Sequence, residues 1–181
     1  MRADARRSHE AILAAAAKLF AAHGSEVQMP QIAEHAGVGM GTMYRHFATK
    51  QALLAAIIAR RFTAMIELAR AAEQVTDPGT AFETLLRSYL EAAEQDAAFR
   101  YAILGPDRKD WAQLAEQKTQ FADIARRILQ RAVDAGRVRS DLSFEDFVLI
   151  TRGAMANMNP GDDDWRRHLT LTLEGIRAPS E

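Results

Sequence analysis

At 181 residues, the chain is long enough for one substantial hydrophobic core or two small ones, and 48% of it is hydrophobic, an ordinary share for a folded protein. It contains no cysteine, which excludes a disulfide framework, a thiolate metal site and a cysteine nucleophile. The net charge of −1 hides an asymmetry: residues 1–61 carry eight basic and four acidic side chains, or +4, so the remainder carries −5. This split suggests that the front of the chain contacts a polyanion, but chance scatter of a modest set of charges explains it equally well.

The composition predicts an all-α fold, because alanine is frequent in the first half, proline is scarce and β-branched runs are nearly absent. Apolar runs such as AILAAAA are too short to span a bilayer. The charged N-terminal segment MRADARRSHE leads into no signal-like apolar stretch. We therefore expect a soluble cytoplasmic protein with no membrane partner.

The first elements in chain order are short helices around a glycine turn. Apolar residues at helical spacing over 12–20 predict an amphipathic helix that ends at Gly24. A short helix follows over 30–36, and a second over about 40–47, where two apolar side chains stand four residues apart. Two short helices joined by a tight turn containing glycine predict a helix-turn-helix. Thr49 then caps a longer helix.

The rest of the chain also reads as helices with clear boundaries. Asp77 before Pro78 opens a helix, as an N-cap before a proline in the first turn. A long helix runs from about Trp111 to Gly136. Ser143 begins a capping box that opens the next helix, and a final helix carries apolar residues over 165–176.

The segment AGVGMGTMYRHFATK, residues 36–50, places three glycines before a cluster of side chains suited to DNA. Gly37 can take the positive φ that the turn needs, and the free N–H groups of the following helix suit a phosphate. Threonine and tyrosine suit thymine methyls and the backbone, while histidine and lysine suit the sugar-phosphate wall. Arg45 can read a guanine or contact a phosphate, and both roles stay open. The candidate DNA-binding residues are Gly41, Thr42, Tyr44, Arg45, His46 and Lys50.

The ordered string A-G-V-G-x-G-T-x-Y-R-H-F-x-x-K, within residues 7–58, resembles the DNA-binding domain of the TetR family of bacterial transcription regulators. The resemblance implies a three-helix, homeodomain-like helix-turn-helix domain over residues 1–55. A C-terminal helical bundle for effector binding and dimerisation would occupy residues 56–181. It also places Thr42, Tyr44, His46 and Lys50 at positions that contact DNA in the family. One position departs: Gln28 stands where a serine or threonine usually precedes the helix before the turn, which weakens a phosphate contact from there.

The resemblance also implies a small effector and dimerisation through the last two helices. Aromatic and methionine residues at helical spacing are more often core than ligand wall, but some must line any effector cavity. The candidate effector-binding residues are Phe82, Tyr89, Tyr101, Trp111, Phe121, Phe147, Thr151 and Met155. The candidate dimer residues are Val148, Trp165, Leu169, Leu173 and Ile176, although packing within one chain would use the same stripe.

Together these features and the resemblance predict a ligand-responsive transcription regulator, most simply a repressor. It would bind a palindromic double-stranded DNA operator as a homodimer in the bacterial cytoplasm. We expect no enzymatic activity and no catalytic residues, because no nucleophile–base pair, paired carboxylates or phosphate-cradling loop stands out. We also expect no cofactor and no metal, because the histidines lack ligand-like spacing. The alternative is a helical small-molecule carrier or sensor without specific DNA readout.

Overall fold

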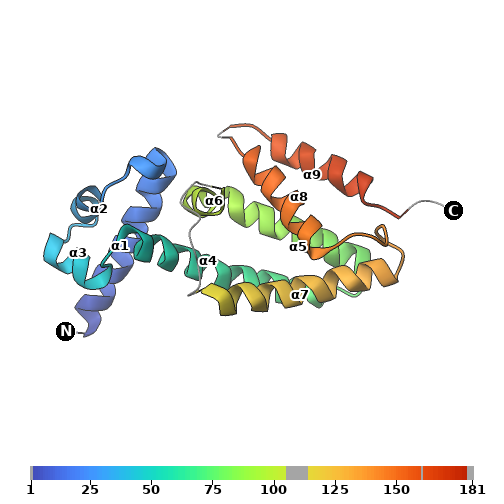
Figure 1. Cartoon of the computed structure of the whole chain (residues 1–181), viewed down its shortest axis with the longest axis horizontal. Helices are drawn as coiled ribbons and strands as arrows, with labels where there is room; N and C mark the ends of the chain where they lie inside the picture. Colours follow the sequence, from blue (N-terminus) through green and yellow to red (C-terminus); the bar gives the residue numbers. More distant parts are fainter. Residues whose placement is uncertain (1, 105–113, 160, 179–181) are drawn as a thin grey trace. The chain divides into compact units, whose positions relative to one another are not determined.

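The computed structural model describes residues 2–104, 114–159 and 161–178, and they are predominantly helical, which confirms the all-α class. The helices are α1 (Arg2–His23), α2 (Met29–His35), α3 (Met40–His46), α4 (Lys50–Glu73), α5 (Pro78–Glu94), α6 (Ala97–Leu104), α7 (Ala115–Asp134), α8 (Phe144–Ala156) and α9 (Asp164–Gly175), with a short 3-10 helix, η1, at Gly24–Glu26 (Figure 1).

The helices form two compact units. Unit 1 contains the described residues of 1–61 and 96–114, and unit 2 those of 62–95 and 115–181. The continuous helix α4 contributes residues to both. Unit 1 therefore includes α6, which the sequence-based boundary at residue 55 did not place with the front helices. The division of DNA-binding and effector-binding roles at that boundary stays a prediction.

Unit 1 has its own hydrophobic core, in which α1 packs against α2, α3 and α6. The core side chains come from every helix of the predicted helix-turn-helix and from the start of α4. The fully buried members include Ile12, Ile32, Met43 and Leu53. Because α2 and α3 are only seven residues each, this shared core rather than helix propensity holds them in place.

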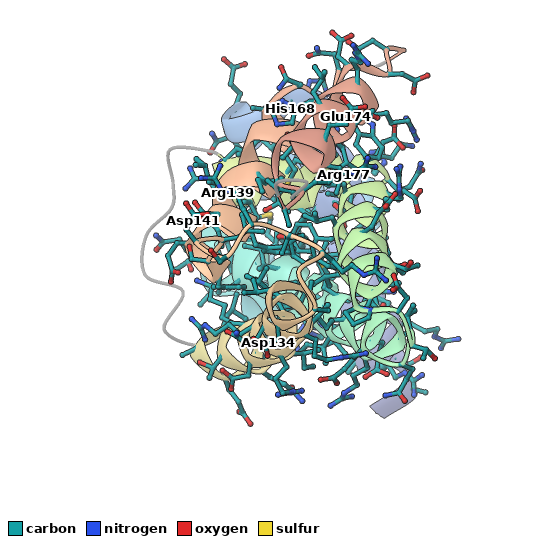
Figure 2. The ribbon with its side chains drawn as sticks, turned by 90° about the vertical axis from the view of Figure 1, so that its right-hand side faces the viewer. Asp134, Arg139, Asp141, His168, Glu174 and Arg177 are labelled. Carbon is teal, nitrogen blue, oxygen red and sulfur yellow. The ribbon has the colours of Figure 1, made fainter. Side chains whose placement is uncertain are left out.

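Unit 2 is a helical bundle in which α5 packs against α7 and α8, and α9 packs against α8 (Figure 1). Its core contains an aromatic cluster from α4, α5, α7 and α8. An isolated antiparallel bridge joins Val138, in the α7–α8 connection, to Arg177 after α9. This bridge holds Arg177 against the α7–α8 connection (Figure 2).

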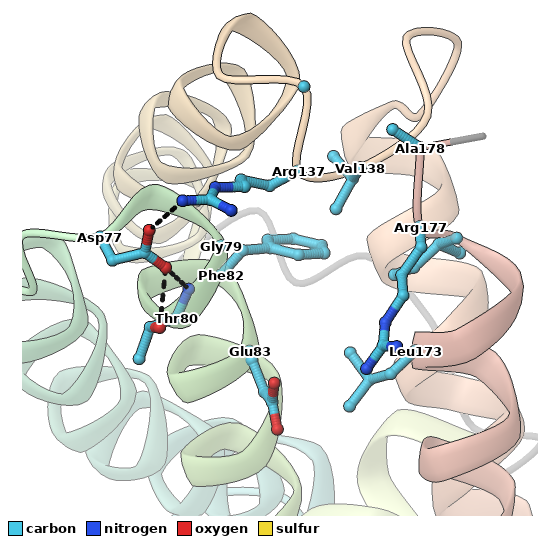
Figure 3. A pocket seen from close by; sticks show the side chains of 12 residues that line it. Asp77, Gly79, Thr80, Phe82, Glu83, Arg137, Val138, Leu173, Arg177 and Ala178 are labelled. Carbon is cyan, nitrogen blue, oxygen red and sulfur yellow. Dashed lines mark hydrogen bonds and ion pairs between the residues drawn. The ribbon is translucent and has the colours of Figure 1, made fainter. Parts of the chain in front are cut away.

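Local capping explains the starts of α4, α5 (Figure 3) and α8. The Thr49 hydroxyl accepts from the N–H of Ala52 at 3.0 Å, and Asp77 accepts from the N–H of Thr80 at 2.9 Å. Both capping predictions are confirmed, as is the box at the start of α8, where Ser143 and Asp146 exchange hydrogen bonds.

One break was absent from the sequence-based description, which opens a helix at Pro78 and names no other helix start before Trp111. The helix stops at Glu94, and α6 begins after Asp96. The Asp96 carboxylate accepts from the N–H of Phe99 at 2.9 Å and from Arg61 at 2.6 Å. The cap and the ion pair together stabilise the start of a new helix at this position.

Candidate DNA-binding surface

The turn between α2 and α3 is closed by backbone hydrogen bonds around a left-handed glycine. Gly37 has φ +65°, as the sequence predicted. Its N–H donates to the carbonyl of Glu34 at 3.0 Å, and the next N–H, of Val38, donates to Ala33 at 3.0 Å. Val38 packs against the core beneath the turn. The result is a tight, anchored turn that sets the direction in which α3 leaves.

The rotation of α3 about its axis decides which side chains reach solvent. Met43 is completely buried and Phe47, directly after the helix, is 4% exposed, so both anchor α3 to the unit 1 core. Tyr44 is 51% exposed, and Gly41 and Arg45 are exposed as well. The helix therefore presents its polar and aromatic side chains outward.

Arg45 folds back along its own helix. Its Nε donates to the carbonyl of Gly41 at 3.0 Å, and its Nη2 donates to the Thr42 hydroxyl at 3.0 Å. Since the Thr42 oxygen accepts from the guanidinium, its hydroxyl proton remains free to donate to a phosphate or a base acceptor. Thr42 and Arg45 thus form one polar unit on the exposed side of α3, a pairing that their spacing of three residues on a helix allows.

Aromatic and basic side chains from α1, α3 and α4 lie together at the end of α3. The rings of His9 and His46 lie 5.6 Å apart, and His9 stacks on Phe47 at 5.0 Å. Lys50, the first residue of α4, has its ammonium 5.4 Å from the centre of the Phe20 ring. Sequence reasoning missed His9, because nothing in its local pattern on α1 shows that it reaches His46.

The start of α2 is capped without a serine or threonine hydroxyl. The N–H of Gln28 donates to the side-chain oxygen of Gln31 at 2.7 Å, so one free donor at this helix start is satisfied. The Gln28 side chain itself donates to the carbonyl of Glu26 at 3.2 Å. The departure at residue 28 therefore leaves the local fold intact.

The candidate effector residues in unit 2 lie mainly in its core. Tyr89, Phe121 and Phe147 form a buried cluster with ring centroids 5.5–6.0 Å apart, and burial raises the pKa of the Tyr89 phenol well above its usual value. Thr151 and Met155 are buried too, and the Thr151 hydroxyl donates to the carbonyl of Phe147 at 2.9 Å. Their role in effector binding stays a prediction.

The other three candidate effector residues lie elsewhere. Phe82 lines an open pocket of about 360 Å³ rather than the aromatic cluster. Trp111 lies outside the described residues, as does the side chain of Tyr101.

The candidate dimer residues divide into buried and accessible sets. Trp165 and Leu169 are 2% and 0% exposed within one chain, and the Trp165 indole donates to Glu94 at 2.8 Å, so they offer a partner almost no surface. Leu173 and Ile176 line the same pocket as Phe82. Val148 is 37% exposed. The large apolar residues that are exposed on α8 and α9 are Val148, Leu149 and Leu171.

Two further findings concern the described residues. None of their helices combines the length and apolar character needed to cross a bilayer. Within the same residues, no group of three or more histidines and carboxylates is arranged to hold a metal ion.

Comparison with known proteins identifies the family of both units. The profile described as "Bacterial regulatory proteins, tetR family" matches residues 12–57, which contain the helix-turn-helix. The profile described as "Transcriptional regulator SbtR-like, C-terminal domain" matches residues 77–178, more than half of the chain. The chain belongs to the TetR family of bacterial regulatory proteins. TetR-family proteins are transcription factors rather than enzymes, and they typically dimerise and respond to small molecules.

Individual relatives agree with this assignment. A TetR transcription regulatory protein from Mycobacterium vanbaalenii is 30% identical, with a TM-score of 0.63, over 97% of this chain and 98% of its own. A gamma-butyrolactone receptor described as ArpA-like is 25% identical, with a TM-score of 0.66, over 93% of this chain and 85% of its own. An HTH-type transcriptional regulator of Staphylococcus aureus is 44% identical over 61 residues, which are 33% of this chain and only 33% of that protein's length.

Proposed function

We propose that this TetR-family protein is a homodimeric, ligand-responsive repressor of the bacterial cytoplasm that binds a palindromic operator through α3. The observation that carries the proposal is the orientation of α3. Met43 and Phe47 fix the helix to the core, and this leaves Thr42, Tyr44 and Arg45 on its accessible side. A recognition helix needs this combination of a rigid anchor and an exposed polar face.

In this proposal each side chain of the surface has a separate task. Tyr44 and the methyl of Thr42 lie against thymine methyls or the backbone, and the Thr42 hydroxyl donates to an acceptor on DNA. His46 and Lys50, at the end of α3 and the start of α4, contact the sugar-phosphate wall. Arg45 holds the Thr42 hydroxyl in place and offers its remaining N–H groups to DNA.

A homodimer would form through α8 and α9. Val148, Leu149 and Leu171 expose apolar surface on these two helices, and a second copy of the chain would cover it. A two-fold axis through this contact makes the DNA-binding surfaces equivalent. The two α3 helices would then enter successive major grooves about 34 Å apart and read the half-sites of a palindrome.

Effector binding would act through α7 and α4. Phe121 of α7 belongs to the aromatic cluster, and Arg131 of the same helix donates to the carbonyls of Glu73 and Val75, at 2.8 and 3.1 Å, at the end of α4. A ligand that displaces α7 would therefore pull on the helix that begins with Lys50. The gamma-butyrolactone receptor among the structural neighbours supports a small-molecule effector for this chain.

The test is a fluorescence anisotropy titration with a labelled DNA fragment from upstream of the protein's own gene, repeated across a series of salt concentrations. We expect specific binding that weakens steeply as salt rises. Lys50→Gln should lower affinity for all sequences alike and reduce the slope of log K against log[salt] by about 1. Lys18→Gln, at an exposed position of α1 outside the proposed surface, should change neither.

The carrier hypothesis makes a different prediction for the same experiment. A carrier without DNA readout would show no specific binding, and its affinity for a ligand would not change when DNA is added. A regulator must show reciprocal coupling between the ligand and the DNA, because linkage acts equally in both directions. Specific binding without any such coupling would leave a DNA-binding protein but remove the ligand response.

A further inference from the structure

The first turns of α1 carry basic side chains to which the proposed function gives no task. The helix begins at Arg2, but its buried side starts only at Ile12, which is completely buried. Residues 3–11 are exposed or half-buried. Helix α1 also contacts α3, and Figure 1 shows its N-terminal end running past α3. This end of α1 is therefore accessible and lies next to the proposed recognition helix.

His9 connects this end of α1 to the proposed DNA-binding surface. Its ring stacks on Phe47, with the centroids 5.0 Å apart, and its centroid lies 5.6 Å from that of His46. Both histidines are half-buried, so part of each ring is open to solvent. An imidazole has at least one N–H donor in either protonation state. His9 can therefore donate to a phosphate beside the one assigned to His46.

Arg6 continues the side of α1 that carries His9. At 100° per residue, the two positions differ by about 60° around the helix and by one turn along it. Arg7 is about 160° around the helix from His9 and so lies on the other side. Two arginines that are adjacent in sequence thus differ in their position relative to His46 and α3.

The acidic side chains of this end of α1 are already paired. Asp4 accepts a hydrogen bond from Arg7, and Glu10 accepts one from Arg60 of α4 at 2.8 Å. Arg6 is exposed, and within the described part of the chain its guanidinium has no hydrogen bond or ion pair. The positive charge of Arg6 is therefore available to a polyanion outside the chain.

We propose that the DNA-binding surface extends onto α1, where Arg6 and His9 contact the phosphates next to the one assigned to His46. Donors on these side chains form charge-assisted hydrogen bonds with phosphate oxygens. Such contacts carry no sequence information but fix the register of a recognition helix on the duplex. The inference rests on the proposed binding of DNA through α3 and adds to it two residues of a different helix.

The first test compares Arg6→Gln with Arg7→Gln, which remove the same charge from adjacent exposed positions. Anisotropy titrations with the operator fragment are run across a series of salt concentrations. Arg6→Gln should weaken binding about tenfold and reduce the slope of log K against log[salt] by about 1. Arg7→Gln should stay close to the wild type in both quantities.

The outcomes separate this inference from the proposed function. Equal effects of the two substitutions would overturn the assignment of Arg6, because they would show that only the net charge of α1 matters. A wild-type slope in Arg6→Gln, alongside specific binding by the wild type, would also overturn the assignment of Arg6 while leaving the recognition helix in place. Absence of specific binding by the wild type would overturn the proposed function, and this inference with it.

The second test uses His9→Phe, which retains an aromatic ring against Phe47 but removes the N–H donors. Thermal unfolding followed by circular dichroism should match the wild type, and DNA affinity should fall about tenfold. Operator fragments in which neutral methylphosphonates replace single phosphates then locate the contacts. Arg6→Gln and His9→Phe should each become insensitive to replacement of one phosphate to which the wild type is sensitive. Wild-type affinity and an unchanged phosphate profile in His9→Phe would overturn the phosphate contact and restrict His9 to packing on Phe47.

Discussion

The sharpest test of the DNA-binding surface compares two neighbouring residues of α3. Met43 is completely buried and Tyr44 is 51% exposed, although they are adjacent in sequence and in the same helix. Replacing each with alanine should therefore separate stability from DNA affinity. Met43→Ala should unfold unit 1 more easily, while Tyr44→Ala should leave the fold intact and weaken DNA binding.

The size of each effect follows from burial. Met43→Ala removes a fully buried side chain from a small core, so we expect a loss of about 2–5 kcal/mol in the free energy of unfolding. Tyr44→Ala removes a half-exposed side chain and substitutes the best helix former, so stability should change by no more than about 0.5 kcal/mol. The lost phenol contact to DNA should weaken binding about tenfold, as for a hydrogen bond to a charged group.

Urea unfolding followed by circular dichroism measures the first effect, and anisotropy with the operator fragment measures the second. The binding assay is run at a temperature where both variants are folded, so that loss of structure does not imitate loss of contact. Equal destabilisation by the two substitutions would refute the rotation of α3. A folded Tyr44→Ala protein that binds DNA like the wild type would refute the contact assigned to Tyr44.

Three further predictions concern the turn, a helix cap and the proposed dimer. Gly37→Ala should cost about 1–2 kcal/mol in urea unfolding, because φ is +65° and no atom lies within 4 Å of an added Cβ, so backbone strain acts alone. Gly41→Ala, inside α3, should instead stabilise by up to about 1 kcal/mol, and equal effects would contradict the assigned turn. Hydrogen bonds from the Ser143 hydroxyl and N–H hold the pKa of Asp146 below its usual value, so its stabilisation is present above pH about 4 and is lost as pH falls below that. Asp146→Asn should therefore be less stable than the wild type at pH 7, with a difference that shrinks in acid, and a difference independent of pH would contradict the cap. Leu149→Glu should yield folded monomers in sedimentation velocity, and an unchanged sedimentation coefficient would exclude the exposed α8 surface from the dimer.

Unit 1 could be predicted closely from sequence because its signals are local. The positive φ of Gly37 and the cap of Thr49 on α4 depend on residues within a few positions along the chain. The spacing of four between Met43 and Phe47 predicted the helix, but it left open whether Met43 or Tyr44 faces outward. The structure decides this, because it buries Met43 and leaves Tyr44 51% exposed.

Features that depend on distant partners could not be predicted in this way. The start of α6 depends on Asp96, whose carboxylate is held by Arg61 from a different helix. His9 joins the surface through contacts with His46 and Phe47, which lie far along the chain. Similarly, Arg177 lines the pocket because a bridge after α9 places it there. In each case the tertiary fold, rather than a motif, brings the groups together.

The last helix shows why an apolar pattern alone does not identify an interface. Trp165 and Leu169 share one side of α9, whereas Leu171 lies about 200° around the helix from Leu169, at 100° per residue. A sequence with apolar residues on both sides does not say which side faces the chain's own core. The structure buries Trp165, whose indole also donates to Glu94, and leaves Leu171 51% exposed. A dimer built on Trp165 would have to break that hydrogen bond and unpack the core, so a partner that covers Leu171 and Leu149 is the less costly arrangement.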